Sequence, residues 1–255
     1  MNQNEKAAHF ASLHVPGIPC VLYNIWDAGS AQAVERAGAK AIATGSWSVA
    51  AAQGYEDGER IPLDFVERIV QRICTSTALP VTVDFEGGYA TAPAELAANV
   101  TRILAAGAVG INFEDQVVNG SGLYEVSTQC ERLAAIRDAA KKFGVALYIN
   151  ARTDLFLEAL DDKDHAGLLD EAKTRADAYE KAGASGLFVP GLKDETLIGD
   201  LCRHTGLPVN IMMKEGVPPR ATLAALGVAR ISYGPAPFRT CTNALKGHAE
   251  AIYTK

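Results

Sequence analysis

Short apolar runs alternate along this chain with longer amphipathic stretches, and the joint between the two kinds of segment recurs. A phrase centred on Gly occurs four times, at residues 36–42, 105–111, 181–187 and 225–231. In each copy an Ala-rich amphipathic stretch ends at the Gly, and an apolar run follows at once. Gly just past the end of a helix readily adopts the left-handed conformation that closes it. The repeat therefore predicts a helix-to-strand joint, and with it a repeated βα architecture.

This reading predicts eight strands and eight helices in strict alternation. The strands are expected at about residues 19–24, 39–44, 80–84, 109–114, 146–151, 186–190, 208–212 and 228–233. The helices are expected near residues 28–38, 62–76, 92–106, 127–142, 165–182, 194–204, 218–226 and 236–251. Eight such units are typical of an α/β fold of the (β/α)8 TIM-type barrel, and no linker divides residues 1–255, so one domain is expected. A doubly wound sheet is the alternative, but residues 24–30 do not form its Gly-rich phosphate turn.

Composition and charge narrow the function. The chain has 255 residues, of which 48% are hydrophobic and 21% charged, as in ordinary globular proteins. A net charge of −6 without a dense Lys/Arg cluster argues against nucleic acid as a partner. No apolar run approaches the roughly 20 residues that span a bilayer, and the polar N-terminus has no signal-peptide segment, so a cytoplasmic location without membrane contact is expected. The five cysteines are odd in number and widely spaced, which predicts reduced packing residues.

Carboxylates stand where two neighbouring strands are expected to end. Asp84 and Glu86 follow the third apolar run, and Glu114 with Asp115 ends the fourth. The carboxyl ends of barrel strands meet at one rim, where the active sites of such barrels lie. Acids that meet there repel one another and need a cation, hydrogen bonds or protons. Because hard oxygen ligands favour Mg²⁺ or Mn²⁺, we predict a metal site at this rim. Asp27, after the first strand, is equally well explained as a helix N-cap.

Other groups at the predicted strand ends suit a small anionic acid. Arg152 could hold a carboxylate through two hydrogen bonds, and the backbone N–H groups of residues 45–47 could hold an oxyanion. All five histidines lie outside the predicted strand ends, so a histidine base or ligand is not indicated and each is expected on the surface or in a helix. Lys193 and Lys214 follow their strands by two or three residues.

Motifs along nearly the whole chain resemble the isocitrate lyase/phosphoenolpyruvate mutase superfamily. The matching stretches are residues 26–31, 44–46, 54–58, 83–89, 110–116, 149–154, 188–191, 208–210 and 230–234. The resemblance implies a (β/α)8 barrel that forms a homodimer or homotetramer, with the last helix exchanged between subunits. It also implies Mg²⁺ bound partly through water, and 2-oxo or 2-hydroxy acid substrates whose C–C or P–C bond is broken or made through a pyruvate enolate.

The resemblance assigns roles to individual residues. Asp84, Glu86 and Glu114 correspond to the metal-binding acids, and Asp57 to an acid on a mobile loop. Arg152 with the Gly45 and Ser46 amides corresponds to the clamp for the oxo acid, and Asn210 to an amide that binds a carboxylate. The expected catalytic residues are therefore Asp57, Arg152 and Ser46. The expected substrate-binding residues are Trp26, Gly45, Ser46, Trp47, Arg152 and Asn210.

Three departures from the family pattern bear on the activity. Residues 117–124 contain neither the catalytic Cys of isocitrate and methylisocitrate lyases nor the Lys-x-Asn-Ser loop of phosphonopyruvate enzymes, and Glu86 replaces an Asp. Decarboxylation needs no cysteine acid, because CO₂ leaves unprotonated. The sequence therefore favours a Mg²⁺-dependent lyase or decarboxylase for a small 2-oxo acid of the oxaloacetate type.

Several alternatives remain open at the level of sequence. One is cleavage or hydrolysis of another C–C or P–C bond, assisted by Asp57 or Ser121. A second is a metal-free Schiff-base aldolase that uses Lys193 or Lys214. A third is a non-catalytic barrel that binds an oxo acid. The apolar stretch at residues 236–253 favours self-association under each of these readings.

Overall fold

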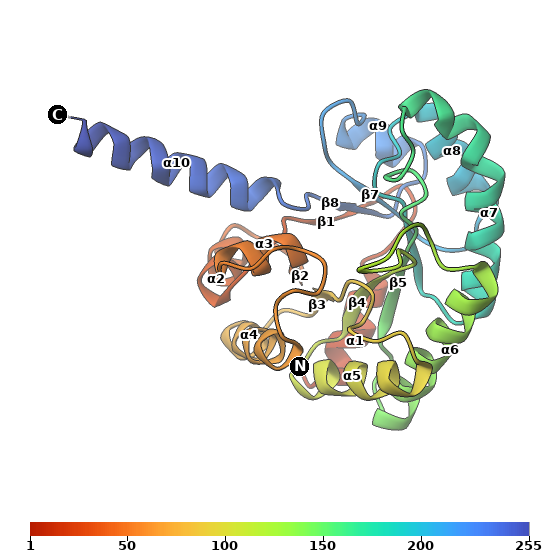
Figure 1. The fold of residues 1–255 in the computed structure, drawn as a ribbon, viewed down its shortest axis with the longest axis horizontal. Coiled ribbons are helices and arrows are strands. Elements are labelled where there is room, and N and C mark those ends of the chain that lie inside the picture. The colour runs from red at the N-terminus through yellow and green to blue at the C-terminus, as the bar shows by residue number, and fades with distance from the viewer. Residues whose placement is uncertain (255) are drawn as a thin grey trace.

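Eight parallel strands form a nearly closed barrel in the computed structural model, which describes residues 1–254 (Figure 1). The strands are β1 (Cys20–Leu22), β2 (Ile42–Ala43), β3 (Val81–Asp84), β4 (Gly110–Glu114), β5 (Tyr148–Arg152), β6 (Gly186–Phe188), β7 (Val209–Met212) and β8 (Arg230–Ser232). Their order around the sheet is β1-β8-β7-β6-β5-β4-β3-β2. A parallel bridge between Ile25 and Thr44 connects the two ends of this sheet, just past β1 and β2. The predicted (β/α)8 TIM-type barrel is confirmed.

The helices follow the strands in the chain as the alternating pattern predicts, and all of those named next except the last lie around the barrel (Figure 1). Those that follow the expected pattern are α2 (Ala28–Arg36), α4 (Leu63–Ser76), α5 (Pro93–Ala105), α6 (Val126–Phe143), α7 (His165–Lys181), α8 (Glu195–His204), α9 (Arg220–Ala225) and α10 (Ala236–Tyr253). A short 3-10 helix, η1 (Asp162–Asp164), precedes α7. Asp27 is the N-cap of α2, where its side chain accepts the Ser30 N–H at 2.7 Å, and this settles the alternative left open for that residue.

Two further helices were not expected from the sequence. The first, α1 (Gln3–Ser12), buries only Ala7 and Phe10, and this apolar signal is too sparse to show helical periodicity. The second, α3 (Ser46–Ala52), begins immediately after Gly45, which is its N-cap. The predicted second strand is also shorter than expected, since only Ile42–Ala43 pair with β3 before the chain turns into α3.

Successive side chains along each strand point alternately toward the surrounding helices and into the barrel interior. On β5, Ile149 and Ala151 alternate with Tyr148, Asn150 and Arg152. Asn150 donates to the side chains of Asn112 on one side and Asn210 on the other, and Asn210 lies two strands away from it. Gly186 on the intervening β6 leaves room for this reach, because a Cβ at that position would lie 3.0 Å from Asn150 Oδ1.

One histidine, His14, departs from the expectation of surface or helix positions, whereas His165 meets it as a helix residue. His14 follows α1 and is buried, with its ring stacked on Tyr148 at a centroid distance of 4.1 Å. Burial, together with the charge of Arg230, lowers the pKa of His14 to about 3. His165 begins α7 as a helix residue but is also buried. Within residues 1–254, no helix is long and apolar enough to cross a membrane.

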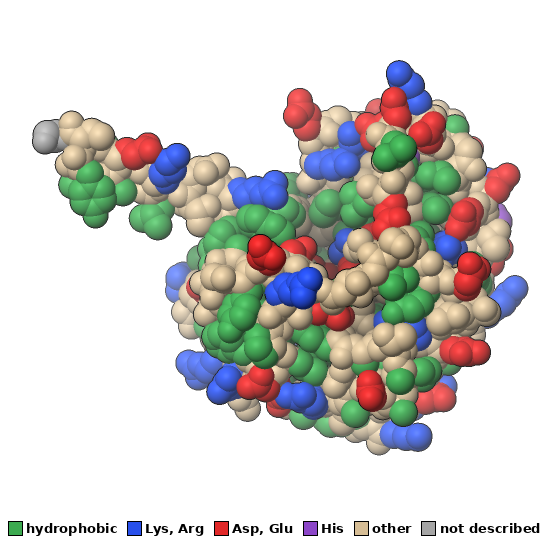
Figure 2. All heavy atoms as spheres, in the orientation of Figure 1, with side chains coloured by type: hydrophobic (Ala, Val, Ile, Leu, Met, Phe, Trp, Pro, Cys, Tyr) green, Lys and Arg blue, Asp and Glu red, His purple; other side chains and the backbone are tan. Residues whose placement is uncertain are grey.

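The last helix, α10, projects away from the barrel (Figure 1). Leu245, Ile252 and Tyr253 on this helix are exposed by 71%, 70% and 84%, respectively. Figure 2 shows hydrophobic side chains gathered along one side of the projecting helix. Exchange of this helix between subunits stays a prediction.

A buried ion pair fastens the end of β4 to α7. Asp115 has no exposed surface, and its Oδ2 accepts from the Tyr179 hydroxyl at 2.7 Å and from Arg175 Nη1 at 3.1 Å. Its Oδ1 accepts the backbone N–H of Asp154 at 3.0 Å, just past β5. Asp115 is therefore a structural residue, although it directly follows the predicted metal ligand Glu114.

We expect Asp115→Ala to lower the free energy of unfolding by about 2–5 kcal/mol, because the buried Tyr179 hydroxyl and the Asp154 N–H would lose their acceptor and Arg175 would keep only Glu171 as a carboxylate partner. Urea denaturation would measure the change. Asp138→Ala removes an exposed carboxylate 3.8 Å from Lys141 Nζ, and as the matched control it should cost about 0.5 kcal/mol or less. A similar, small effect for both variants would contradict the structural role of Asp115.

Candidate active site

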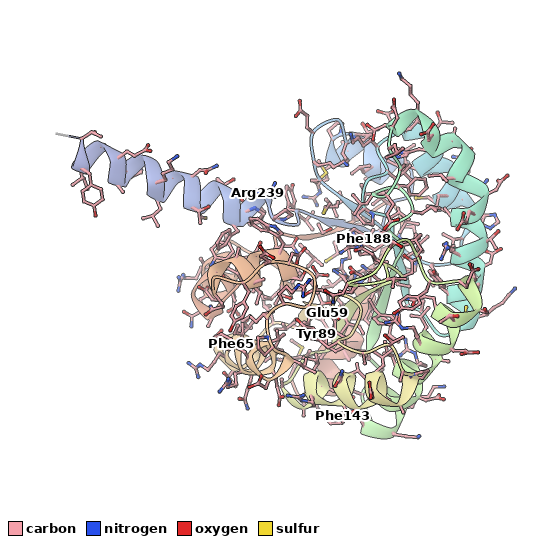
Figure 3. The ribbon with its side chains drawn as sticks, viewed as in Figure 1. Glu59, Phe65, Tyr89, Phe143, Phe188 and Arg239 are labelled. Carbon is pink, nitrogen blue, oxygen red and sulfur yellow. The ribbon has the colours of Figure 1, made fainter. Side chains whose placement is uncertain are left out.

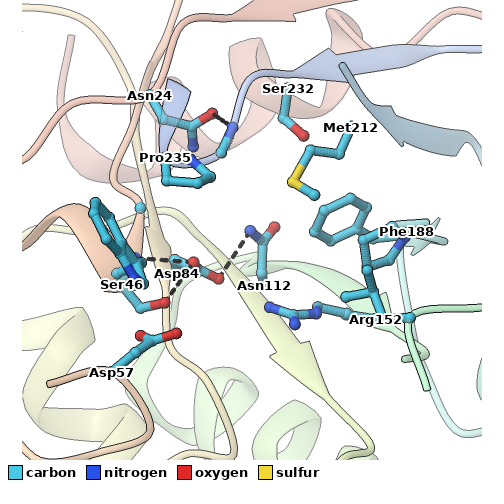
Figure 4. A pocket seen from close by; sticks show the side chains of 15 residues that line it. Asn24, Ser46, Asp57, Asp84, Asn112, Arg152, Phe188, Met212, Ser232 and Pro235 are labelled. Carbon is cyan, nitrogen blue, oxygen red and sulfur yellow. Dashed lines mark hydrogen bonds between the residues drawn. The ribbon is translucent and has the colours of Figure 1, made fainter. Parts of the chain in front are cut away.

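Two adjoining cavities lie at the carboxyl ends of the strands. Figure 4 shows the first of them. This cavity has a volume of about 150 Å³. The predicted residues that line it are Gly45, Ser46, Trp47, Asp57, Asp84 and Arg152. The second cavity, of about 140 Å³, is lined by Glu86 and Glu114 and shares Ser46, Asp57 and Arg152 with the first. The structure thus brings together the predicted catalytic and metal-binding residues.

Asp84 is held by donors from the start of α3 and from the neighbouring strand β4. Its Oδ2 accepts from both the backbone N–H and the hydroxyl of Ser46, each at 2.9 Å. Its Oδ1 accepts from Asn112 Nδ2 at 3.2 Å. Ser46 reaches Asp84 because α3 starts directly after β2, and Asn112 reaches it because β4 pairs with β3 in that register. These contacts fix the carboxylate at the floor of the cavity.

The Ser46 contact changes one prediction. The Ser46 N–H donates to Asp84, and the Gly45 N–H donates to the carbonyl of Ile25 at 3.1 Å. Two of the three amides that were expected to hold an oxyanion, those of Gly45 and Ser46, are therefore engaged within the protein. The sequence could not show this, because the donor at Ser46 and the acceptor at Asp84 are 38 residues apart.

Arg152 lies between two carboxylates at the end of β5. Its Nη2 donates to Asp154 Oδ2 at 2.7 Å, and its Nη1 is 2.9 Å from Glu114 Oε2. Burial alone would lower the pKa of Arg152, but Glu114 and Asp154 offset this effect and the pKa lies well above its ordinary value. The guanidinium is therefore permanently charged and fixed in orientation, with only 17% of the side chain exposed.

The remaining carboxylates face one another without a matching number of cations. Burial, followed by the charges of Asp57 and Asp84, raises the pKa of Glu86 to about 8. Burial and the charge of Asp84 raise the pKa of Asp57. Burial also raises the pKa of Glu114 well above its ordinary value, although Arg152 opposes the shift. Negative charge in this part of the site is thus in excess of what Arg152 balances.

This donor set fits a hard divalent cation that retains water. The available groups are carboxylate oxygens, which Mg²⁺ and Mn²⁺ prefer. Among residues 1–254, no three Asp, Glu, His or Cys side chains stand close enough together to hold an ion by themselves. Each predicted ligand has other partners: Asp84 has Ser46 and Asn112, Glu114 has Arg152, and Glu86 Oε2 accepts the Glu59 N–H at 2.7 Å. Mg²⁺ keeps several of its waters in many protein sites, so Asp84, Glu86 and Glu114 could hold it largely through water.

The loop that bears Asp57 is fastened to the turn after β3. Glu59 Oε1 accepts the Tyr89 N–H at 2.7 Å, and Figure 3 shows the two residues close together. Glu86 and Tyr89 both have a positive φ, of 49° and 58°, so this turn is strained at two non-glycine residues. Reciprocal hydrogen bonds with Glu59 stabilise that conformation and place Asp57 over the cavity.

Two predicted substrate-binding residues lie outside the cavities. Trp26 packs edge-on against Phe238 at a centroid distance of 5.0 Å, near the start of α10. Asn210 is fully buried one layer below the cavity, where its Nδ2 donates to Ser232 Oγ at 3.2 Å. Because side chains on a strand alternate, Met212, two residues further on, reaches the cavity in place of Asn210.

Several cavity residues were not singled out from the sequence. Asn24 ties the barrel together, since its Nδ2 donates to the Thr44 carbonyl at 2.8 Å and its Oδ1 accepts the Gly234 N–H at 2.9 Å. Asn112 and Met212 also line the cavity. Asn24 and Met212 are the last residues of two predicted strands. A search that included the last residue of every strand, whether polar or apolar, would have found both.

Neither candidate Schiff-base lysine lines either cavity. Lys193 Nζ is 2.7 Å from Asp162 Oδ2. Burial and the charge of Lys193 lower the pKa of Lys214. The 117–124 loop contributes Val117, Val118, Asn119 and Gly120 to the second cavity, whereas Ser121 is not part of its lining.

We expect the metal-free protein to lose stability as the pH rises from about 5 to 8. The folded-state pKa of Glu86, about 8, exceeds its ordinary value of 4.5, so the folded protein binds more protons than the unfolded chain in this range. Urea denaturation in EDTA should show that the free energy of unfolding falls less between pH 5 and pH 8 for Glu86→Gln than for the wild type. Glu131→Gln, an exposed position on α6, is the control and should follow the wild type. The same change in the free energy of unfolding with pH for all three proteins would contradict the raised pKa of Glu86.

Comparisons with known proteins agree with this architecture. The family model for phosphoenolpyruvate phosphomutase matches residues 10–253. A crystal structure described as a putative phosphonomutase from Burkholderia cenocepacia is 46% identical, with a TM-score of 0.95 over 98% of this chain and 99% of that one. The 2-methylisocitrate lyase of Escherichia coli is 28% identical over 95% of this chain and 84% of its own length. The oxaloacetate decarboxylase of Bradyrhizobium diazoefficiens is 28% identical over 82% of this chain and 71% of its own length. The chain belongs to the phosphoenolpyruvate phosphomutase family, within the isocitrate lyase/phosphoenolpyruvate mutase superfamily.

Proposed function

We propose that this protein is a Mg²⁺-dependent lyase of the decarboxylase type, which acts on a small 2-oxo acid through a pyruvate-enolate-like intermediate. The observation that carries the proposal is the pairing of one fixed guanidinium, Arg152, with an excess of rim carboxylates in a cavity of about 150 Å³. Such a site can bind a small anion only when a cation offsets the acids. The relatives described as a lyase and a decarboxylase support the same reaction class.

The polar residues that line the cavity have complementary roles in this reaction. Arg152 would orient the C1 carboxylate of the substrate. The Ser232 hydroxyl accepts from Asn210, which leaves its own proton free to donate into the cavity. Asn210 would thereby act through Ser232 instead of touching the substrate. Asp84, Glu86 and Glu114 would hold Mg²⁺, whose Lewis acidity would stabilise the negative charge of an enolate.

Asp57 is the residue we assign to proton transfer. Its raised pKa increases the fraction of carboxylic acid near neutral pH, which is what a proton donor needs. After the C3–C4 bond breaks and CO₂ leaves, the enolate carbon would take its proton from Asp57. Ser46, which holds Asp84 in place, would act as a positioning residue.

The 117–124 loop favours decarboxylation over other cleavages. Its cavity-lining residues, Val117, Val118, Asn119 and Gly120, carry no acid or base that could serve a departing aldehyde and no cation for a phosphoryl group. A departing CO₂ needs neither. Cleavage of a C–P bond and a purely binding role stand as the alternatives, and neither would release CO₂ from oxaloacetate.

We expect Mg²⁺-dependent, EDTA-sensitive release of CO₂ and pyruvate from oxaloacetate or a close analogue, above the Mg²⁺-driven decay without protein. Arg152→Gln and Asp84→Asn should each lower kcat/KM by about 10²-fold or more, because each removes a charge that the transition state needs. Circular dichroism would confirm that both variants fold. Lys193→Ala and Lys214→Ala are controls and should retain activity. Turnover that survives EDTA and is lost with either lysine would instead identify a Schiff-base enzyme.

We further propose that α10 mediates self-association into a homodimer or homotetramer. Three large apolar side chains, Leu245, Ile252 and Tyr253, are exposed on this projecting helix, and burial against a second copy would remove them from water. Light scattering should show an oligomer for the wild type and a smaller species for Leu245→Glu combined with Ile252→Glu. Lys246→Glu alters charge on the same helix without removing apolar area and should leave the oligomer intact. A monomeric wild type would refute the proposal.

A further inference from the structure

The main cavity has two chemically different walls. Figure 4 shows Asp57, Asp84 and Ser46 on one side, and Phe188 and Met212 on another. Besides Phe188 and Met212, the second wall includes Leu157 and Pro190. Nothing assigned so far to the polar residues explains why the β6 and β7 ends carry large apolar side chains into a site built for an anion.

The apolar wall is held in place by the strand register and by two glycines. Phe188 pairs with Arg152 across β5 and β6, and the ring centroid lies 5.9 Å from the guanidinium carbon. Gly234 has a φ of +51°, and a Cβ at that position would lie 2.6 Å from Met212 Sδ. Gly191 similarly accommodates the backbone at Phe156 and Leu157, since its Cβ would lie 2.8 Å from the Phe156 carbonyl oxygen. Phe188 and Met212 are therefore fixed by packing, whereas the Leu157 side chain remains 40% exposed.

The charge distribution of the lining excludes a second anionic group at this wall. Of the cavity-lining residues, Arg152 alone is cationic, and it already faces Glu114 and Asp154. Lys193, the next cation along the chain after β6, is paired with Asp162 outside the cavity. A carboxylate placed against Phe188 and Met212 would lose its hydration and could gain only the neutral Ser232 hydroxyl beside Met212, with no cation, whereas an alkyl group would gain from burial.

We propose that the substrate is a 2-oxo acid that carries an alkyl group on C3, and that Leu157, Phe188 and Met212 bind this alkyl group. The inference rests on the proposed function and names its substrate class. In a decarboxylation, the C3–C4 bond breaks, its electron pair enters the enolate and CO₂ leaves. C3 then takes a proton, and its alkyl group remains against the apolar wall throughout. The wall therefore selects the substrate without taking part in bond breaking.

Binding tests this proposal independently of turnover. Calorimetry with Mg²⁺ would compare pyruvate, 2-oxobutanoate, 2-oxopentanoate and 2-oxoglutarate as ligands. We expect affinity to rise by about threefold to fourfold for each added methylene, the value for its full burial. We expect 2-oxoglutarate, which ends in a carboxylate, to bind at least tenfold more weakly than 2-oxopentanoate. Equal affinity for pyruvate and 2-oxopentanoate, or preference for 2-oxoglutarate, would overturn the proposal.

Substitutions in the apolar wall test whether it causes the gain in affinity for each added methylene. Phe188→Ala and Met212→Ala should each reduce the gain per methylene while changing pyruvate affinity by less than about threefold. Leu160→Ala is the matched control, because Leu160 is fully exposed in the same segment as Leu157. A gain per methylene that survives both wall variants would show that the alkyl group binds elsewhere.

Turnover separates this inference from the proposed function. Oxaloacetate and 3-methyloxaloacetate would be compared by CO₂ release, and we expect kcat/KM to be at least about fourfold higher for the methylated acid. Equal turnover of both acids would leave the decarboxylase proposal standing and overturn the substrate class. Binding of the alkyl series without turnover of either acid would support the substrate class and refute decarboxylation. If Phe188→Ala lowers kcat for oxaloacetate but leaves alkyl binding unchanged, the wall faces the departing carboxylate and the proposal is wrong.

Discussion

One guanidinium surrounded by carboxylates is the interaction on which this site depends. Arg152 is bound by Glu114 and Asp154, and its charge balances only part of the acid that faces the cavities. Buried carboxylates in excess of their cations cannot all be ionised cheaply, which is why burial and mutual repulsion raise the pKa values of Asp57, Glu86 and Glu114. A divalent cation would relieve this imbalance, and a small anion could then bind. Metal and substrate binding are thus expected to be coupled through charge.

The barrel keeps these charges in place through a polar layer beneath them. Asn112, Asn150, Asn210 and Arg230 form this layer. Asn150 bridges to Asn112 and Asn210, and Arg230 donates to Asn112 at 3.0 Å. Asn112 in turn donates to Asp84, so the layer supports a predicted metal ligand directly. Gly186 is the residue that allows the amides to meet across β6. The interior therefore combines packing with orientation of the site above it.

Neighbouring residues of the same type have unlike roles because strands and turns point them apart. Glu114 faces Arg152 at the cavity, whereas Asp115 turns outward to Arg175 and Tyr179. The two sides of the cavity divide in a similar way. The ends of β3, β4 and β5 contribute Asp84, Asn112 and Arg152, and the ends of β6 and β7 contribute Phe188 and Met212. The charged and the large apolar lining residues thus come from different strands.

The sequence by itself determined the fold class, the order of the strands and most of the rim acids, because hydrophobic periodicity and the residue at each strand end are local properties. Capping rules also described Asp27, whereas Asp57 was assigned through the resemblance to the superfamily. The tertiary structure alone decided that the Ser46 N–H binds Asp84, that Trp26 packs on Phe238, and that Asn210 lies below the cavity while Met212 lines it. Those outcomes depend on strand register, barrel closure and contacts between residues far apart in the chain, and no local pattern encodes such distances.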